Sequence, residues 1–212
     1  IGGLLAAIAW YYPFYLPLLA IPVGAVVIFR LDNPEPEEKT RLREYLARTW
    51  RSINVREVWA LFIITILLFV ILYGSYLTFF PLLLERSFGA TSVHIGFVMS
   101  GMSLTTAAVS SQLGRLRRQF SARRLLIYSV SLYFVALMLI YLATGWFLVA
   151  LAVLLFGMGH GLIIPNVQTM LVGFASINER AAFMSVNSMV LRIGQTLGPV
   201  GIGLFYQIGD LR

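Results

Sequence analysis

The sequence predicts an all-α protein, a polytopic bundle of membrane helices. Its 212 residues are 59% hydrophobic and 12% charged, with a mean hydropathy of +0.84, and a soluble chain of this length cannot bury so much apolar surface. Long apolar runs alternate with short polar breaks, and 13 of the 16 Lys and Arg residues lie in every second break. This alternation is the charge asymmetry that orients a polytopic membrane protein.

The length of the apolar runs divides the chain into helices. One crossing needs about 20 apolar residues, and this length predicts a stub followed by six crossings. Residues 1–7 are the stub, expected to be the end of a helix whose beginning is absent. Residues 10–29 are the first crossing, which Pro13, Pro17 and Pro22 interrupt and Arg30 ends. Residues 31–57 are the longest linker, in which an acidic, turn-rich stretch precedes a basic amphipathic surface helix over 39–56.

Five further crossings follow this linker. They are predicted over residues 58–84, 93–113, 125–143, 146–172 and 182–208. These runs are apolar nearly all round, whereas most helices of a soluble protein carry a polar face at helical period. The sequence therefore predicts that they face lipid or one another.

The positions of the cations predict the orientation of these crossings. If residues 31–57 are cytoplasmic, 13 cations lie inside, whereas Arg86 and Arg212 lie outside and Arg192 lies within the last crossing. The opposite orientation would invert this bias. We therefore expect residues 31–57 and 114–124 to be cytoplasmic.

Several classes of function are disfavoured by the composition. The net charge is +7, yet the basic residues occupy loops and form no aromatic-interleaved stripe, so no nucleic acid is expected as a partner. The chain has no cysteine, which removes disulfides and thiolate metal sites. It also lacks a zinc-protease motif, a P-loop, a nucleophile elbow and a pair of membrane carboxylates. We expect no enzyme activity, metal or cofactor.

His160 is an ionisable residue inside a predicted crossing. An imidazole changes charge near neutral pH, so His160 is a candidate for proton coupling or substrate contact, or it is a structural residue hydrogen-bonded between helices. Gly157 and Gly161 flank it at the spacing that lets membrane helices approach closely. Pro165 follows within two turns and frees a backbone carbonyl, which permits a kink.

Arg192 is a second charged residue within a crossing. Its placement in the middle of a helix costs about 2.5–3.5 kcal/mol, so it should face the bundle interior and find an acceptor. No acidic residue of the sequence lies in the middle of a crossing. Its partner is then a carbonyl, a polar side chain, an anionic group of a substrate or a carboxylate elsewhere in the protein. A role in substrate binding or gating and a structural pairing both remain open.

Further candidates for a substrate cavity are aromatic or carry amides. They are Tyr73, Tyr76, Phe79, Asn166 and Gln168. The three aromatic residues recur at a spacing of three, which would let them line a cavity that stacks flat aromatic or cationic compounds. Helix packing accounts for the same spacing. Serine and threonine residues between positions 100 and 110 also share one face, where they are expected to bond mainly to their own helix backbone.

The basic loop after the third crossing resembles a loop of the Major Facilitator Superfamily. Residues 114–124 read Gly-Arg-Leu-Arg-Arg-Gln-Phe-Ser-Ala-Arg-Arg and are similar to Gly-x-Leu-x-Asp-Arg-x-Gly-Arg-Arg, in its weaker copy between helices eight and nine. Arg118 replaces the acidic residue and Ser121 replaces the second glycine, so the charge relay attributed to the stronger copy is not implied. The resemblance assigns Gly114 and Arg115 to gating or helix packing.

A second resemblance lies in the last crossing. Its glycines are similar to the Gly-x-x-x-Gly-Pro-x-x-Gly-Gly signature of drug-exporting members, in the copy on helix eleven and with imperfect spacing. These residues are Gly194, Gly198, Pro199, Gly201 and Gly203. Gly2 and Gly3 would be the end of the copy on helix five. The long linker also matches the loop between the two halves of such transporters, so the resemblance covers essentially the whole chain.

The resemblance implies an incomplete fold of the MFS type. Residues 1–30 would be the helix-five stub and helix six, residues 31–57 the cytoplasmic linker between the halves, and residues 58–212 helices seven to eleven, with helix twelve absent. Residues 125–143 would be a lipid-facing helix nine. Two helical bundles would rock about a site at the membrane midplane.

The resemblance also implies a function. It indicates a secondary transporter of a bacterial inner membrane, which exports small amphipathic or drug-like compounds by proton antiport. The partners would be this small-molecule substrate, protons, the lipid bilayer, and the missing N-terminal half with helix twelve, where the proton carboxylate is expected. One alternative is uptake or exchange of an anionic solute held by Arg192. Another is a membrane scaffold or receptor, for which a cavity without convergent polar groups would be indicative.

Overall fold

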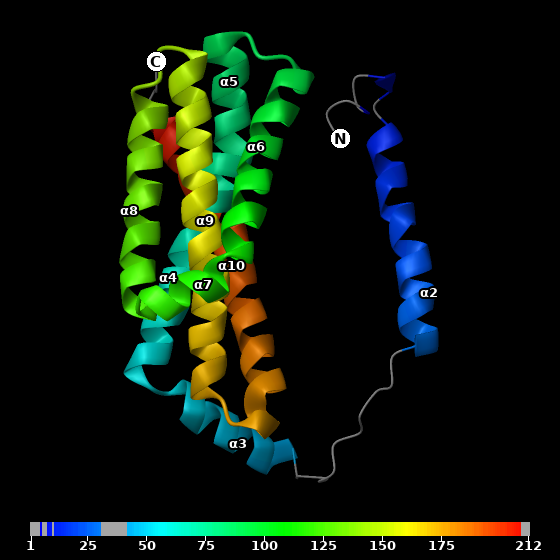
Figure 1. The fold of residues 1–212 in the computed structure, drawn as a ribbon, viewed down its shortest axis with the longest axis vertical. Helices are drawn as coiled ribbons and strands as arrows, with labels where there is room; N and C mark the ends of the chain where they lie inside the picture. Colours follow the sequence, from blue (N-terminus) through cyan, green and yellow to red (C-terminus); the bar gives the residue numbers. More distant parts are fainter. Residues whose placement is uncertain (1–4, 6–7, 10, 31–41, 209–212) are drawn as a thin grey trace.

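The computed structural model describes residues 5, 8–9, 11–30 and 42–208, and in these ranges the chain is a set of helices joined by short connections (Figure 1). In chain order they are η1 (Tyr12–Leu19), α2 (Ala20–Arg30), α3 (Leu42–Ile53), α4 (Arg56–Val70), η2 (Ile71–Phe79), α5 (Phe80–Phe88), α6 (Ser92–Ser111), α7 (Leu113–Gln119), α8 (Ala122–Tyr141), α9 (Trp146–Phe174), η3 (Ile177–Glu179) and α10 (Arg180–Ile208). The described residues contain no strand. The predicted all-α class is confirmed.

Elements α4, η2 and α5 form one continuous rod over Arg56–Phe88. Its central section, η2, is a π-helix that the sequence analysis did not predict, and the amide of Phe80 donates to the carbonyl of Ser75, five residues earlier. Pro81 follows directly and has no amide hydrogen with which to continue an α-helical ladder. A wider turn just before this proline is a local adjustment of the kind that π-helical segments provide. The rod ends at Gly89, which has a φ of 59°.

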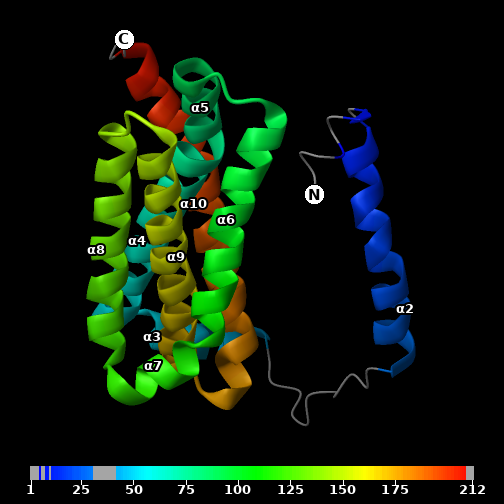
Figure 2. The same cartoon turned by 45° about the horizontal axis from the view of Figure 1, so that its top comes forward.

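The helix α9 lies at the centre of the bundle. It packs against α8 and α6, whereas α10 packs along α4 and η2 (Figures 1 and 2). Four side chains of α9 spaced by about two turns are at most 1% exposed, namely Val149, Phe156, Ile163 and Leu171. This spacing places them on one face of the helix, which forms the core of the bundle.

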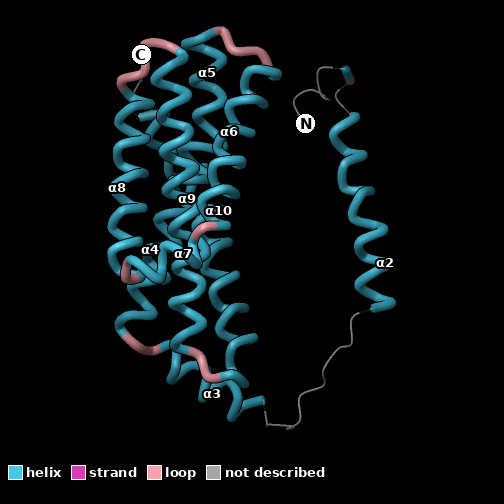
Figure 3. Tube along the Cα trace, viewed as in Figure 1, coloured by secondary structure: helices cyan, strands magenta, loops and turns pink. Residues whose placement is uncertain are grey.

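Four of the described helices are long and apolar enough to cross a membrane. They are Arg56–Phe88, Ser92–Ser111, Ala122–Tyr141 and Trp146–Phe174. Each coincides, within a few residues at either end, with a predicted crossing. The helix α10 coincides with the predicted crossing over 182–208 but is less apolar, and Pro17–Arg30 is a shorter apolar helix. Short loops join the bundle helices α4 to α10 (Figure 3), so consecutive long helices run antiparallel.

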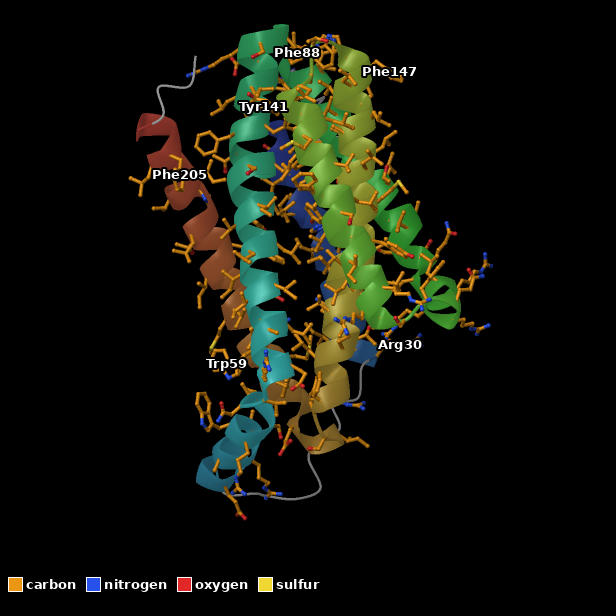
Figure 4. All side chains as sticks on the ribbon, turned by 90° about the vertical axis from the view of Figure 1, so that its left-hand side faces the viewer. Arg30, Trp59, Phe88, Tyr141, Phe147 and Phe205 are labelled. Atoms are coloured by element: carbon orange, nitrogen blue, oxygen red, sulfur yellow. The ribbon has the colours of Figure 1, made fainter. Side chains whose placement is uncertain are left out.

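Labelled aromatic side chains lie at both ends of these helices (Figure 4). Trp59 lies near α3, whereas Phe88 and Phe147 lie at the opposite end. At that end the rings of Phe88 and Trp146 are 5.5 Å apart. Aromatic rings at these two levels are typical of the two interfaces of a membrane.

The helix α3 lies across one end of the bundle (Figure 1). The predicted surface helix over 39–56 is observed over Leu42–Ile53. Ser52 Oγ donates to Glu179 Oε2 at 3.0 Å, and Glu179 is only 8% exposed. Ile53 is buried in the main core. These contacts attach α3 to η3, the connection between α9 and α10.

The predicted first crossing over 10–29 is divided between η1 and α2. Tyr12–Leu19 is a 3-10 helix with Pro17 inside it, one of the three prolines that were expected to interrupt this crossing. A proline interrupts the α-helical ladder because it lacks an amide hydrogen. The helix α2 has no buried residue and stands apart from the bundle (Figures 1 and 2). Gly2, Gly3 and residues 31–41 lie outside the described residues.

Candidate functional site

An open hollow lies between η2, α6 and α9. It has a volume of about 360 Å³. Its lining residues are Leu72, Leu77, Met102, Ser103, Thr106, Ala107 and His160. The imidazole of His160 is the ionisable group among them and lies midway along α9 (Trp146–Phe174). The lining is thus mainly apolar, with a titratable side chain at mid-helix.

The imidazole of His160 is held by Tyr133 of α8. The Tyr133 hydroxyl and His160 Nδ1 are 2.6 Å apart, and Tyr133 is 2% exposed. Gly159 makes room for this ring, because a Cβ there would lie 3.0 Å from Tyr133 Cδ2. Because this hydrogen bond involves Nδ1, Nε2 is the ring nitrogen that can interact with a molecule in the hollow. A hydrogen bond to one nitrogen also sets the tautomer and orientation of the ring.

Stacked aromatic rings connect this histidine to η2. Phe156 of α9 lies between Tyr76 and Tyr133, with ring centroids 4.5 Å and 4.4 Å away. Tyr76 also stacks on Phe80 at 5.1 Å. Offset and edge-to-face ring pairs at these distances are attractive beyond the area they bury. The rings therefore fix α8, α9 and the π-helical section relative to one another.

Two glycines of α9 bring its backbone against α6. A Cβ at Gly157 would lie 2.7 Å from the carbonyl oxygen of Met102, and one at Gly161 would lie 2.6 Å from that of Thr106. Thr106 Oγ1 donates to the carbonyl of Gly157 at 3.1 Å, and Ser110 Oγ donates to that of Gly161 at 2.9 Å. Small residues at this spacing allow such interhelical bonds in membranes.

Four of the hydroxyls of α6 show two kinds of hydrogen bond. Ser100 and Ser103 donate to their own helix, as expected, at the carbonyls of Gly96 and Met99. Thr106 and Ser110 instead bond to α9, an interhelical role that the sequence analysis did not predict.

Glycines also form the contact between α10 and the rod of α4 and η2. A Cβ at Gly194 would lie 2.7 Å from the carbonyl oxygen of Ile66, and one at Gly74 would lie 2.7 Å from that of Gly198. Both helices therefore approach with backbone against backbone. Pro199 lies inside α10, which is continuous across it, as α9 is across Pro165.

Arg192 belongs to a short polar chain on α10 and η2. Its Nη1 donates to Gln195 Oε1 at 2.9 Å, and Gln195 Nε2 donates to the Tyr73 hydroxyl at 3.2 Å. Arg192 is exposed, and no described acidic residue forms an ion pair with it. The expectation was a position facing the bundle interior with an acceptor, and among the described helices the side chain is exposed. The polar acceptor is Gln195 of its own helix.

The other predicted cavity residues lie away from the hollow. Tyr76 is 1% exposed and packs in the core, Phe79 approaches Gly203 of α10, and Asn166 is buried with its Nδ2 donating to the carbonyl of Ala122. Gln168 lines a small cavity of about 10 Å³. The structure thus places His160 at the hollow and Tyr73 beside Gln195, and it does not bring the remaining candidates to either position.

Gly114 and Arg115 lie on α7, outside both positions. A Cβ at Gly114 would meet no atom within 4 Å, so this glycine makes no close helix contact. Arg115 is exposed. Among the described residues, no group of three His, Cys, Asp or Glu side chains has the arrangement of a metal site.

Helices long and apolar enough to cross a membrane, close glycine contacts between them and a ligand-sized hollow at mid-helix are features that a membrane transporter needs. The sequence model of the Major Facilitator Superfamily matches residues 1–199. The chain belongs to this superfamily. No curated protein matches it.

Membership establishes the general class of function. The chain is a multi-pass membrane protein of a transporter family whose members bind small-molecule substrates within the membrane, and it is not a member of an enzyme family. This agrees with the lack of the enzyme motifs sought in the sequence.

Proposed function

We propose that this protein is a secondary transporter that exports small amphipathic or drug-like compounds in exchange for protons. The observation that carries the proposal is the hollow of about 360 Å³ between η2, α6 and α9, with His160 in its otherwise mainly apolar lining. Sites for small molecules are commonly 300–1,000 Å³, mostly apolar and supplied with few polar groups. An amphipathic compound matches such a lining.

His160 supports the exchange of a proton for a cationic compound. Its Nδ1 is held by Tyr133, and a proton on both ring nitrogens would place a positive charge at the wall of the hollow while Nδ1 donates to the Tyr133 oxygen. In a low-dielectric site this charge repels a cationic ligand strongly. Binding of a proton and binding of the compound would then oppose each other, which is the coupling that antiport requires.

The positions of the glycines support alternating access. A site at the midplane is exposed to one side and then the other when two helical bundles rock about it. Backbone contacts at Gly157, Gly161 and Gly194 keep the described helices in rigid contact, since a bulkier residue has no room there. The described bundle is therefore suited to move as one body.

The distribution of cations supports an orientation. Arg48, Arg51 and Arg180 lie at the end that carries α3, and the basic helix α7 lies towards the same end (Figure 1). We propose that this end faces the cytoplasm of a bacterial inner membrane, in accord with the excess of Lys and Arg in cytoplasmic loops.

The test of proton exchange compares the two histidines of the chain. The full-length protein is reconstituted in vesicles, and the accumulation of a fluorescent amphipathic cation is followed with and without a pH gradient. His160→Gln retains a partner for Tyr133 but cannot carry the charge, so we expect the gradient-driven part of the accumulation to disappear. His94→Gln is the matched control, because His94 bonds to Thr91 at the start of α6. Gradient-driven accumulation that survives His160→Gln would refute proton exchange through this residue.

Arg192 favours a second candidate, the transport of an anionic solute. Its guanidinium is exposed and has Gln195, but no described carboxylate, as a side-chain partner. A guanidinium binds carboxylate or phosphate in a bidentate geometry that an ammonium cannot reproduce. Transport of an anionic solute should fall in Arg192→Lys and further in Arg192→Gln. Unchanged uptake in both variants would exclude a specific role of the guanidinium.

A further inference from the structure

A second hollow lies on the outer surface of the bundle, away from the candidate site. It has a volume of about 360 Å³ and is lined by Ile64 of α4 and by Arg123, Leu126, Ile127, Val130 and Ser131 of α8. We call it the α4–α8 groove. The helix α9 separates α8 from α6, so this groove is on the opposite side of α9 from the hollow at His160.

The walls of the α4–α8 groove are mainly apolar and exposed. Ile127 and Val130 are 56% and 50% exposed although both are apolar. Figure 4 views the bundle from the side on which α8 is seen, and α8 meets the length and composition of a membrane-crossing helix. Apolar side chains exposed on such a helix contact acyl chains in the bilayer.

One end of the α4–α8 groove is cationic. Arg123 lines it at the second residue of α8, directly before the exposed Arg124. Glu57 is the second residue of the neighbouring α4, and it forms no ion pair with Arg123. The amino-terminal end of α8 adds the positive end of a helix dipole. The guanidinium therefore remains open to an anion from outside the protein.

The dimensions fit a single phospholipid. Seven residues separate Arg123 from Val130, a distance of about 10 Å along a helix. One leaflet of the hydrocarbon core is about 15 Å thick. If the guanidinium of Arg123 lies at the level of the lipid phosphate, the apolar part of the groove therefore lies beside the part of the acyl chain nearest the headgroup.

From this arrangement we propose that the α4–α8 groove binds an anionic phospholipid, with the phosphate on Arg123 and an acyl chain along Ile127 and Val130. A guanidinium forms paired hydrogen bonds with phosphate oxygens. Basic pockets between membrane helices recognise anionic headgroups in this way. The net charge of the headgroup matters, because a zwitterionic lipid carries its own ammonium group, which Arg123 and Arg124 repel.

The experiment measures binding of two lipids to the delipidated full-length protein by native mass spectrometry. The probes are phosphatidylglycerol and phosphatidylcholine. We expect phosphatidylglycerol to bind more tightly, and Arg123→Gln to weaken it about fivefold, which corresponds to one arginine near a lipid headgroup. The matched control is Arg118→Gln, which removes the same charge from the exposed surface of α7 and should leave the affinity unchanged.

A second pair of variants tests the apolar part of the groove. Val130→Trp fills it and should weaken both lipids, whereas Met138→Trp adds the same side chain to an exposed position of α8 outside the groove and should have no effect. Equal losses in Arg123→Gln and Arg118→Gln would overturn the proposal, because the lipid would then sense only surface charge. Unchanged binding in Val130→Trp, or equal affinity for the two lipids, would also overturn it.

Discussion

Replacing Gly161 by alanine tests how closely α6 and α9 are held together. The added Cβ would lie 2.6 Å from the carbonyl oxygen of Thr106 and 3.0 Å from Val109 Cβ. Ordinary contacts of a Cβ begin at 3.4 Å, so the two helices would have to separate by about 0.8 Å. Because the nearest atom belongs to the backbone, rotation of a side chain cannot relieve the clash.

The expected loss combines packing and hydrogen bonds. The bonds from Ser110 to Gly161 and from Thr106 to Gly157 are 2.9 Å and 3.1 Å long, and the separation would carry both beyond hydrogen-bond length. Each interhelical bond in a membrane contributes about 0.6 kcal/mol, and overpacking costs about 1–3 kcal/mol. Alanine regains about 1 kcal/mol of helix propensity. The net loss in the free energy of unfolding should be about 1–3 kcal/mol.

The matched control is Gly173→Ala on the same helix. A Cβ there would meet no atom within 4 Å, so this variant should be as stable as the parent protein or up to about 1 kcal/mol more stable. Both variants are compared by chemical denaturation in detergent micelles, followed by circular dichroism. Equal stability of Gly161→Ala and Gly173→Ala would refute the reasoning, because the close approach of the two backbones would then carry no energetic weight.

Two further predictions concern hydroxyl groups. Tyr133→Phe should lower the free energy of unfolding by about 1–3 kcal/mol, because it leaves His160 without its hydrogen-bond partner. Tyr76→Phe should be neutral or stabilising, because the buried Tyr76 hydroxyl has no hydrogen-bond partner. Equal losses of stability in the two variants would contradict this contrast. Ser52→Ala should cost about 1.5–3 kcal/mol because it removes the hydrogen bond to the carboxylate of Glu179, and hydrogen exchange in α3 should quicken. Unchanged exchange would show that this bond does not attach α3.

The helices of the bundle were largely predictable from the sequence. Apolar runs of about 20 residues mark the crossings, because such a run is long enough to span the bilayer as a helix. In a helix each backbone polar group finds its hydrogen-bond partner without water. The observed helices Ser92–Ser111 and Trp146–Phe174 begin at or within one residue of their predicted starts. The π-helical section Ile71–Phe79 was missed, although Gly74 and Pro81 supply a signal for it. Composition alone does not distinguish a π-helical turn from an α-helical one.

The candidate site was predictable only in part. His160 was identified because an ionisable residue between glycines is unusual in a membrane helix. Its partner Tyr133 was not identified, since it comes from another helix 27 residues earlier and nothing in the sequence specifies which faces meet. Tyr76 and Asn166 were expected at a cavity, but both are buried by neighbouring helices. A polar residue in an apolar helix is easily recognised in the sequence, but the sequence does not show whether it faces a cavity or a neighbouring helix.

The sequence by itself determined the fold class, the positions of the long helices and the family. These three properties depend on the length and hydropathy of each apolar run and on the residues between the runs. An apolar run in a bilayer forms a helix because only internal hydrogen bonds can satisfy its backbone there. The tertiary structure decided which side chains act together: Tyr133 with His160, Tyr73 with Gln195, and Arg123 with the α4–α8 groove. Such pairs depend on the rotation and separation of packed helices. Those in turn are set by close contacts such as Gly161 against Thr106, which exist only after the helices assemble.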